Sequence, residues 1–84
     1  MNDKIISKKM MVAAHNAEGE PDFFFCVVEG YREDYDWGNF YCAAIDAASR
    51  EGYDPKLAYD EDDPAGKVLA SAFSWDTATK ISLI

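Results

Sequence analysis

The side chains in this sequence that are most suited to catalysis or metal binding are one histidine and two cysteines, His15, Cys26 and Cys42. A thiol beside an imidazole can act as a nucleophilic pair, and the three side chains with one carboxylate could bind zinc. The spacing supports neither arrangement, because no C-x-x-C or other close ligand pair is present and no motif around His15 would orient its ring. We interpret His15 as a histidine beside a loop. Both cysteines are interpreted as reduced core residues, because each lies in an apolar run.

Four consecutive acidic residues at positions 60–63 raise the question of a cation site, because hard cations such as Ca²⁺ prefer clustered carboxylates. This block does not fit the EF-hand pattern. With Asp60 at the first loop position, the glycine position falls on Ala65 and the bidentate position on Ser71. The sequence also has no phosphate-binding glycine loop and no G-x-S-x-G motif. We therefore predict no metal, no cofactor and no enzymatic activity.

Acidic residues are mixed with aromatic rings in two segments, residues 29–37 and 59–63. Carboxylates can accept paired hydrogen bonds from arginine, and tyrosine rings give a large contact area at a low entropic cost. This combination predicts a surface that binds a basic partner. In the alternative interpretation the acids form only a solvated face and the rings belong to the core. The candidate residues are the acids Glu33, Asp34, Asp36, Asp60, Glu61, Asp62 and Asp63 and the rings Tyr31, Tyr35 and Tyr59.

The elements that would position these residues fit one domain spanning residues 1–84. Hydrophobic residues make up 49% of the chain, which is enough for a core and does not fit disorder. Residues 22–30 form a β-branched and aromatic run between turn-forming residues, which predicts a buried strand. Residues 4–14 are predicted to pair with it as an antiparallel strand, with a helix beginning at Ser7 as the alternative.

One central helix is predicted over residues 37–51, with Asp36 as its N-cap and Gly52 at its end. Its opposite face carries Asp46 and Arg50 in the favourable i,i+4 orientation. The predicted apolar stripe, which has helical spacing, consists of Trp37, Phe40, Tyr41, Ala44, Ile45 and Ala48.

The C-terminal part begins with a short predicted strand at residues 56–59 and then has two interpretations. In the first, the acidic block is a hairpin loop and residues 67–75 form a strand, leaving residues 79–84 as a last strand or a tail. In the second, Asp63 caps a second short helix over residues 64–74 that begins with Pro64. The hairpin is preferred because Gly66 would weaken the first helical turn. The predicted architecture is an α+β fold in which a small antiparallel sheet packs against one central helix.

The charge of the chain limits its partners. Sixteen acidic against eight basic residues give a net charge of −8, which repels phosphate backbones and anionic membranes. We therefore expect no direct binding to nucleic acid or membrane, and attraction to basic protein surfaces. The sequence shows neither a signal peptide nor an apolar stretch of about 20 residues, so a cytoplasmic location is expected.

These observations predict a small non-enzymatic binding protein or inhibitor. Carboxylates fixed on a folded surface can imitate the line of phosphates that a nucleic-acid-binding protein recognises, so we predict a DNA mimic that blocks such a surface. In size and charge the chain is similar to small phage and mobile-element inhibitors, anti-CRISPR and anti-restriction proteins among them, a general similarity that transfers no specific site. The alternative is a structural accessory protein that forms oligomers through apolar surface.

Overall fold

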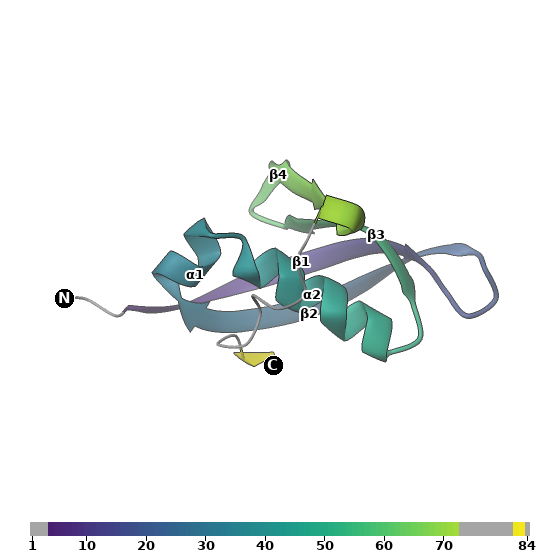
Figure 1. Ribbon diagram of the computed structural model, residues 1–84, viewed down its shortest axis with the longest axis horizontal. Coiled ribbons are helices and arrows are strands. Elements are labelled where there is room, and N and C mark those ends of the chain that lie inside the picture. The colour runs from purple at the N-terminus through teal and green to yellow at the C-terminus, as the bar shows by residue number, and fades with distance from the viewer. Residues whose placement is uncertain (1–3, 73–81, 84) are drawn as a thin grey trace.

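Two long antiparallel strands form the centre of the structure. The computed structural model describes residues 4–72, 82 and 83, and in it β1 (Ile5–His15) pairs along its whole length with β2 (Pro21–Tyr31) (Figure 1). The strand predicted over residues 22–30 and its antiparallel partner over residues 4–14 are both confirmed, and the alternative of a helix beginning at Ser7 is wrong.

A tight turn joins these two strands. The Oδ1 atom of Asn16 accepts hydrogen bonds from the backbone N–H groups of Glu18 and Glu20, each at 3.0 Å. Gly19 adopts a φ of 80°, a backbone conformation that glycine reaches without steric cost. The resulting hairpin is closed by local interactions alone, and it projects beyond the end of the helix that covers the sheet (Figure 1).

Three shorter strands complete the sheet. They are β3 (Asp54–Asp60), β4 (Asp63–Leu69) and the two-residue β5 (Ser82–Leu83). The order across the sheet is β4-β3-β1-β2-β5, and every neighbouring pair is antiparallel. The strand predicted at residues 56–59 is confirmed, and so is a hairpin in place of a helix after it.

The structure corrects the details of that hairpin. Its second strand begins at Asp63 and ends at Leu69, followed by a 3₁₀ turn at Ala70–Ala72, so the predicted second helix over residues 64–74 is wrong. β5 falls inside the segment predicted as a last strand or tail. The rest of the strand predicted over residues 67–75 beyond Ala72, and residues 79–81, lie outside the described residues.

The predicted single helix over residues 37–51 is instead two helices, α1 (Arg32–Asp36) and α2 (Asn39–Arg50). Asp36 ends α1 and does not cap α2, whose N-cap is Gly38 with a φ of 84°. The backbone N–H of Trp37 donates to the carbonyl of Glu33, which closes α1 in the usual way for a helix end. The chain therefore turns at residues 37–38 before it enters the longer helix.

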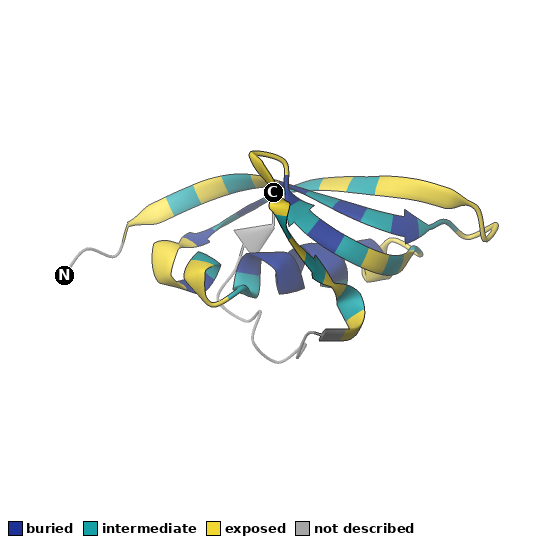
Figure 2. Cartoon of the chain, turned by 90° about the horizontal axis from the view of Figure 1, so that it is seen from above, coloured by how far each residue is buried: buried dark blue, intermediate teal, exposed yellow. Residues whose placement is uncertain are grey.

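The core lies between α2 and one face of the sheet (Figure 2). Alternate residues of β1 and β2 point to α2, as the two-residue period of a strand requires. Burying a side chain of the size of valine, isoleucine or phenylalanine stabilises the fold by about 1.5–3 kcal/mol. The largest fully buried apolar side chains are Phe40, Met10, Ile45, Val12 and Val28.

The predictions for the cysteines and for the Asp46–Arg50 pair agree with the structure. Both cysteines are reduced thiols, with Cys42 buried and Cys26 half-buried in the core layer. The predicted ion pair between Asp46 and Arg50 is formed at 2.9 Å on the exposed side of α2. Within the part of the chain that the structure describes, no helix is long and apolar enough to cross a bilayer.

Candidate binding cleft

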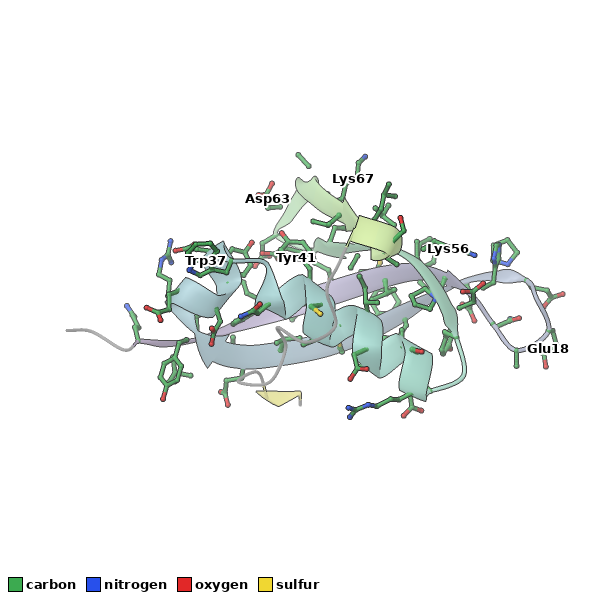
Figure 3. All side chains as sticks on the ribbon, in the orientation of Figure 1. Glu18, Trp37, Tyr41, Lys56, Asp63 and Lys67 are labelled. Atoms are coloured by element: carbon green, nitrogen blue, oxygen red, sulfur yellow. The ribbon has the colours of Figure 1, made fainter. Side chains whose placement is uncertain are left out.

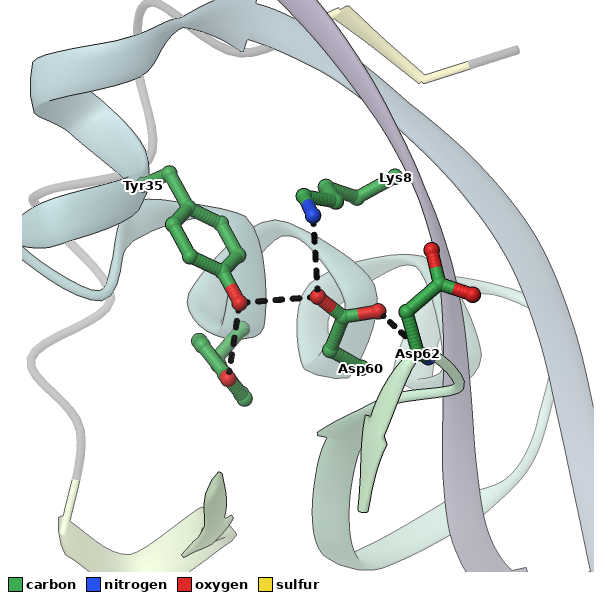
Figure 4. A network of polar contacts seen from close by, with 5 residues as sticks. Lys8, Tyr35, Asp60 and Asp62 are labelled. Atoms are coloured by element: carbon green, nitrogen blue, oxygen red, sulfur yellow. Dashed lines mark hydrogen bonds and ion pairs between the residues drawn. The ribbon is translucent and has the colours of Figure 1, made fainter. Parts of the chain in front are cut away.

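A buried carboxylate joins the two acidic segments of the sequence. Asp60 is the last residue of β3 and its side chain is fully buried (Figure 4). Its Oδ2 atom accepts a hydrogen bond from the Tyr35 hydroxyl at 2.8 Å and lies 3.5 Å from the Lys8 ammonium. Its Oδ1 atom accepts the backbone N–H of Asp62 at 2.9 Å. This network fixes α1 against the β3–β4 turn, so segments distant in the sequence become neighbours.

Tyr35 is held rigidly in this network. Its ring packs edge-on against Phe40 with centroids 5.4 Å apart, and the Lys8 ammonium lies 5.2 Å from the ring centroid. Burial raises the pKa of the Tyr35 hydroxyl well above its usual range, and the hydrogen bonds with Tyr41 and Asp60 raise it further. The hydroxyl therefore remains protonated and acts as a donor to Asp60.

Beside this network lies an open cleft of about 570 Å³ between the α1–α2 turn and β4. Figure 3 shows Trp37 and Tyr41 on the helical side, with Asp63 and Lys67 across from them on the β4 side. We call this feature the acidic cleft. Its lining residues are Tyr35, Asp36, Trp37, Gly38, Tyr41, Asp63, Gly66, Lys67 and Val68.

Two features give the acidic cleft its shape. Trp37 is 82% exposed at the α1–α2 turn, which is unusual for so large an apolar side chain. Gly66 leaves space at the β4 side, because a Cβ atom there would lie 3.1 Å from Asp63 Oδ2 and 3.4 Å from the Tyr41 hydroxyl. The cleft therefore combines accessible ring surface with carboxylates that can accept hydrogen bonds.

The structure divides the predicted acids into two groups. Asp34 and Asp60 are buried and accept hydrogen bonds inside the protein, so neither carboxylate lies on the surface as predicted. Asp34 Oδ1 accepts a hydrogen bond from Asn39 at 3.2 Å, which links α1 to α2; among the described residues its Oδ2 has no partner. The predicted acids that remain exposed, on α1 and the β3–β4 hairpin, are Glu33, Asp36, Glu61, Asp62 and Asp63.

The predicted rings are also divided. Of the three, only Tyr35 lines the acidic cleft. Tyr59 points to the other face of the sheet, where its hydroxyl donates to Met11 Sδ at 3.6 Å. Tyr31, at the end of β2, is 41% exposed and alternates with the inward-facing Gly30. One of the three predicted tyrosine anchors is therefore part of the acidic cleft, and the other two are not.

Trp37 and Tyr41 are cleft residues that were predicted only as part of a core stripe. For Trp37 that prediction is wrong, since its side chain is exposed, whereas Tyr41 is 7% exposed and packs in the core. The signal that could have identified Trp37 is the glycine after it. A glycine in the first turn of a supposed helix favours a break in the chain, which would leave the preceding ring outside.

His15 and Cys26 do not form a nucleophilic pair. Cys26 pairs in register with the buried Met10, whereas His15 has the opposite parity on β1, so the two side chains lie on opposite faces of the sheet. Burial raises the pKa of the Cys26 thiol to about 11, which disfavours the thiolate. Among the described residues, no group of three or more His, Cys, Asp or Glu side chains could hold a metal ion.

Comparisons of the chain with protein-family models, with curated proteins and with solved structures found no match. We therefore infer function from the geometry of the acidic cleft and the charge around it.

Proposed function

We propose that this protein is a non-enzymatic binding protein that docks its acidic cleft on the basic surface of a nucleic-acid-binding protein and competes there with DNA. The observation that supports the proposal best is the convergence of the two acidic segments. The Tyr35–Asp60 hydrogen bond of 2.8 Å joins them, and Asp36 from one segment and Asp63 from the other line one cleft. A DNA mimic requires such a continuous array of carboxylates on a firm base.

The lining of the cleft suits an arginine side chain of the partner. A guanidinium is planar, stacks on aromatic faces and donates to carboxylates in pairs, and the cleft offers Trp37 and two carboxylates. Exposed tryptophan is also among the residues that most often dominate binding energy at protein interfaces. Among the described residues that line the cleft, Lys67 is the one cation, and it lies at the β4 edge. The exposed acids of α1 and the β3–β4 hairpin would steer the basic partner to this site.

Charge reversal tests the location of the binding surface. Reversing Asp63, which lines the cleft, together with its exposed neighbour Asp62 (Asp62→Lys with Asp63→Lys) should weaken binding to a basic partner by about a hundredfold or more. The matched control is Glu18→Lys with Glu20→Lys at the tip of the β1–β2 hairpin, which changes the net charge equally, far from the cleft (Figure 3). Equal losses in the two double variants would mean that only overall charge matters, and the cleft would have no specific role.

The binding measurement uses a panel of DNA-binding proteins, including guide-RNA-loaded CRISPR nucleases and restriction enzymes, titrated at low salt. We expect at least one to bind, the affinity to fall as salt rises, and duplex DNA to compete. Trp37→Ala should weaken the same complex by removing the exposed ring. Simultaneous binding of DNA and this protein to one partner site, or no binding across the panel, would contradict the proposal.

A second function, an accessory protein that associates through apolar surface, is supported by a separate observation. Ile5, Phe23, Phe25 and Leu69 are each more than half exposed. Such an assembly would persist at high ionic strength, whereas an electrostatic complex would dissociate. Size-exclusion chromatography of the protein mixed with a basic partner, at low and high salt, separates the two behaviours.

A further inference from the structure

The face of the sheet opposite α2 is rich in apolar side chains. The residues of β1 that alternate with the buried Met10, Val12 and Ala14 point to this side, as do their register partners on the neighbouring strands (Figure 2). We call this surface the open face. Its apolar residues are Ile5, Met11, Ala13, Phe23, Phe25, Val27, Tyr31, Leu57, Tyr59 and Leu69.

These side chains are contiguous. Ala13 stands in register with Phe23 on one side and Leu57 on the other, and Leu57 pairs with Leu69. In the next row, Met11 pairs with both Phe25 and Tyr59. The rings of Phe23 and Phe25 are 6.5 Å apart, and these two side chains are 51% and 59% exposed. A patch that crosses four strands in this way is uncommon on a monomer and indicates an interface.

We propose that the open face is the interface of a symmetric homodimer, in which two sheets pack face to face about a two-fold axis that runs along the β1–β2 ladder. In that arrangement each copy places its β2 residues over the β1 residues of the other. Phe23 and Phe25 project from β2, whereas their β1 partners Ala13 and Met11 are half-buried and Ala13 is small. The rings that project from β2 of one copy would therefore lie over the less exposed β1 residues of the other copy. This makes the surface complementary to itself.

Charge favours a second copy over a charged partner. The molecule carries a net charge of −8, but the β1 and β2 rows of the open face between Ile5 and Ala13 carry one cation, Lys9, and one anion, Glu29. Lys9 pairs in register with Val27, and Glu29 lies two residues further along β2. The proposed axis brings Lys9 of each copy near Glu29 of the other. The charges of the β1 and β2 rows thus cancel where the two copies meet, and the acidic regions stay apart.

The size of the open face is compatible with a weak dimer. Strands lie about 4.8 Å apart and rise about 3.3 Å per residue, so each residue covers about 16 Å² of flat sheet. The β1 and β2 rows from Ile5 to Ala13, with the shorter stretches of β3 and β4 beside Met11 and Ala13, therefore cover roughly 400 Å². Two copies would bury about twice that, and more with the relief of the side chains, which is the size of a weak, transient interface. The acidic cleft lies on the helical side and stays accessible.

Sedimentation equilibrium of the full chain from about 1 µM to about 500 µM tests the proposal. We expect the mass to rise from 9.4 kDa toward twice that value, with dimerisation retained or strengthened at high salt because screening reduces repulsion between the acidic copies. A monomer over the whole range, dissociation at high salt, or growth beyond a dimer would each overturn the proposed arrangement.

Substitutions locate the interface. Phe25→Lys should weaken dimerisation by about a hundredfold or more, because it buries a charge in place of a ring. The control is Trp37→Lys, which removes a more exposed ring outside the open face and should leave dimerisation unchanged. Lys9→Glu is a milder second variant on an exposed position, and it should also weaken the dimer by placing like charges opposite each other. Wild-type dimerisation in both open-face variants, with circular dichroism showing a native fold, would overturn the proposal.

Discussion

A carboxylate at the end of a strand is stable in the interior only when its oxygen atoms have partners. Asp60 meets this condition with the Tyr35 hydroxyl, the Lys8 ammonium and the backbone N–H of Asp62. Tyr35 contributes most to linking distant segments, because it belongs to α1 while Asp60 belongs to β3.

Tyr35→Phe removes the hydroxyl and leaves the ring packed against Phe40. We expect a loss of about 1–3 kcal/mol in the free energy of unfolding, because a buried carboxylate loses a charge-assisted hydrogen bond. Denaturant titration followed by circular dichroism measures this loss. Tyr31→Phe, at an exposed position at the end of β2, serves as the control and should change stability by less than about 0.5 kcal/mol. Equal stability of the two variants would mean that the Asp60 network does not stabilise the fold.

The reactivity of Cys26 provides a pH-dependent prediction. Burial raises the pKa of its thiol from 9.0 to about 11, so near neutral pH the folded protein holds about a hundredfold less thiolate than the unfolded chain. Alkylation of Cys26 at pH 8 should be slower by a similar factor in the folded state and should accelerate as pH rises. Because the pKa is higher in the folded state, the associated stabilisation is complete below pH 9 and is lost between about pH 9 and 11.

Peptide mapping after timed exposure to iodoacetamide measures the reaction at each thiol. Trypsin places Cys26 and Cys42 in different peptides, because Arg32 lies between them, and the same chain in denaturant is the reference. Equal rates for Cys26 in the folded and unfolded chain would contradict the burial seen in the structure.

Among the elements, the strands were more predictable than the helices. Residues 22–30 are β-branched and aromatic between turn residues, and such a run has few alternatives. The boundary at residues 37–38 was missed because Asp36 resembles a helix cap and the rings after it have helical spacing. Gly38 overrides both signals by taking a φ of 84°.

Gly38→Ala tests the importance of this turn between α1 and α2. A residue with a Cβ atom is strained at a φ of 84°, so we expect the free energy of unfolding to fall by about 1–2 kcal/mol. The substitution should also shift the fluorescence of the neighbouring Trp37. Thermal and denaturant unfolding measure the first effect, and an unchanged stability would show that the turn relaxes into another conformation.

The hairpin of β3 and β4 explains why the candidate site was only partly predictable. Four consecutive acids give no indication of which one points inward, because that depends on the strand register. The register of β3 against β1 places Asp60 opposite the buried Met10, on the helical face of the sheet. The neighbouring Tyr59 must then point to the open face. Sequence therefore identified the acidic segments but could not assign their side chains to faces.

At the scale of the whole molecule, charge is unbalanced by far more than the ion pairs can offset. Sixteen acids face eight basic residues, and among the described residues ion pairs join only Lys8, Arg50 and Lys56 to acids. The exposed pairs Arg50–Asp46 and Lys56–Asp54 each stabilise by about 0–1 kcal/mol. Mutual repulsion of the acids should therefore dominate the dependence of stability on salt.

We expect the melting temperature to rise when sodium chloride is increased from low to moderate concentration, because screening weakens repulsion more than it weakens the few pairs. A shift equivalent to about 1 kcal/mol would be about 4–8 °C for a domain of this size. Calorimetry on a dilute sample isolates this effect from self-association. A lower melting temperature at higher salt would indicate that attractive pairs, not repulsion, control the electrostatics.

The long β1–β2 hairpin has a practical consequence. Its tip is exposed at Ala17, is closed by its own Asn16 hydrogen bonds, and lies at the far end of a molecule 46 Å long. With Cys42 fully buried and the Cys26 thiol held protonated, a single Ala17→Cys substitution would give one fast-reacting attachment point. A fluorophore placed there would report the tumbling of the whole particle without touching either surface proposed for binding.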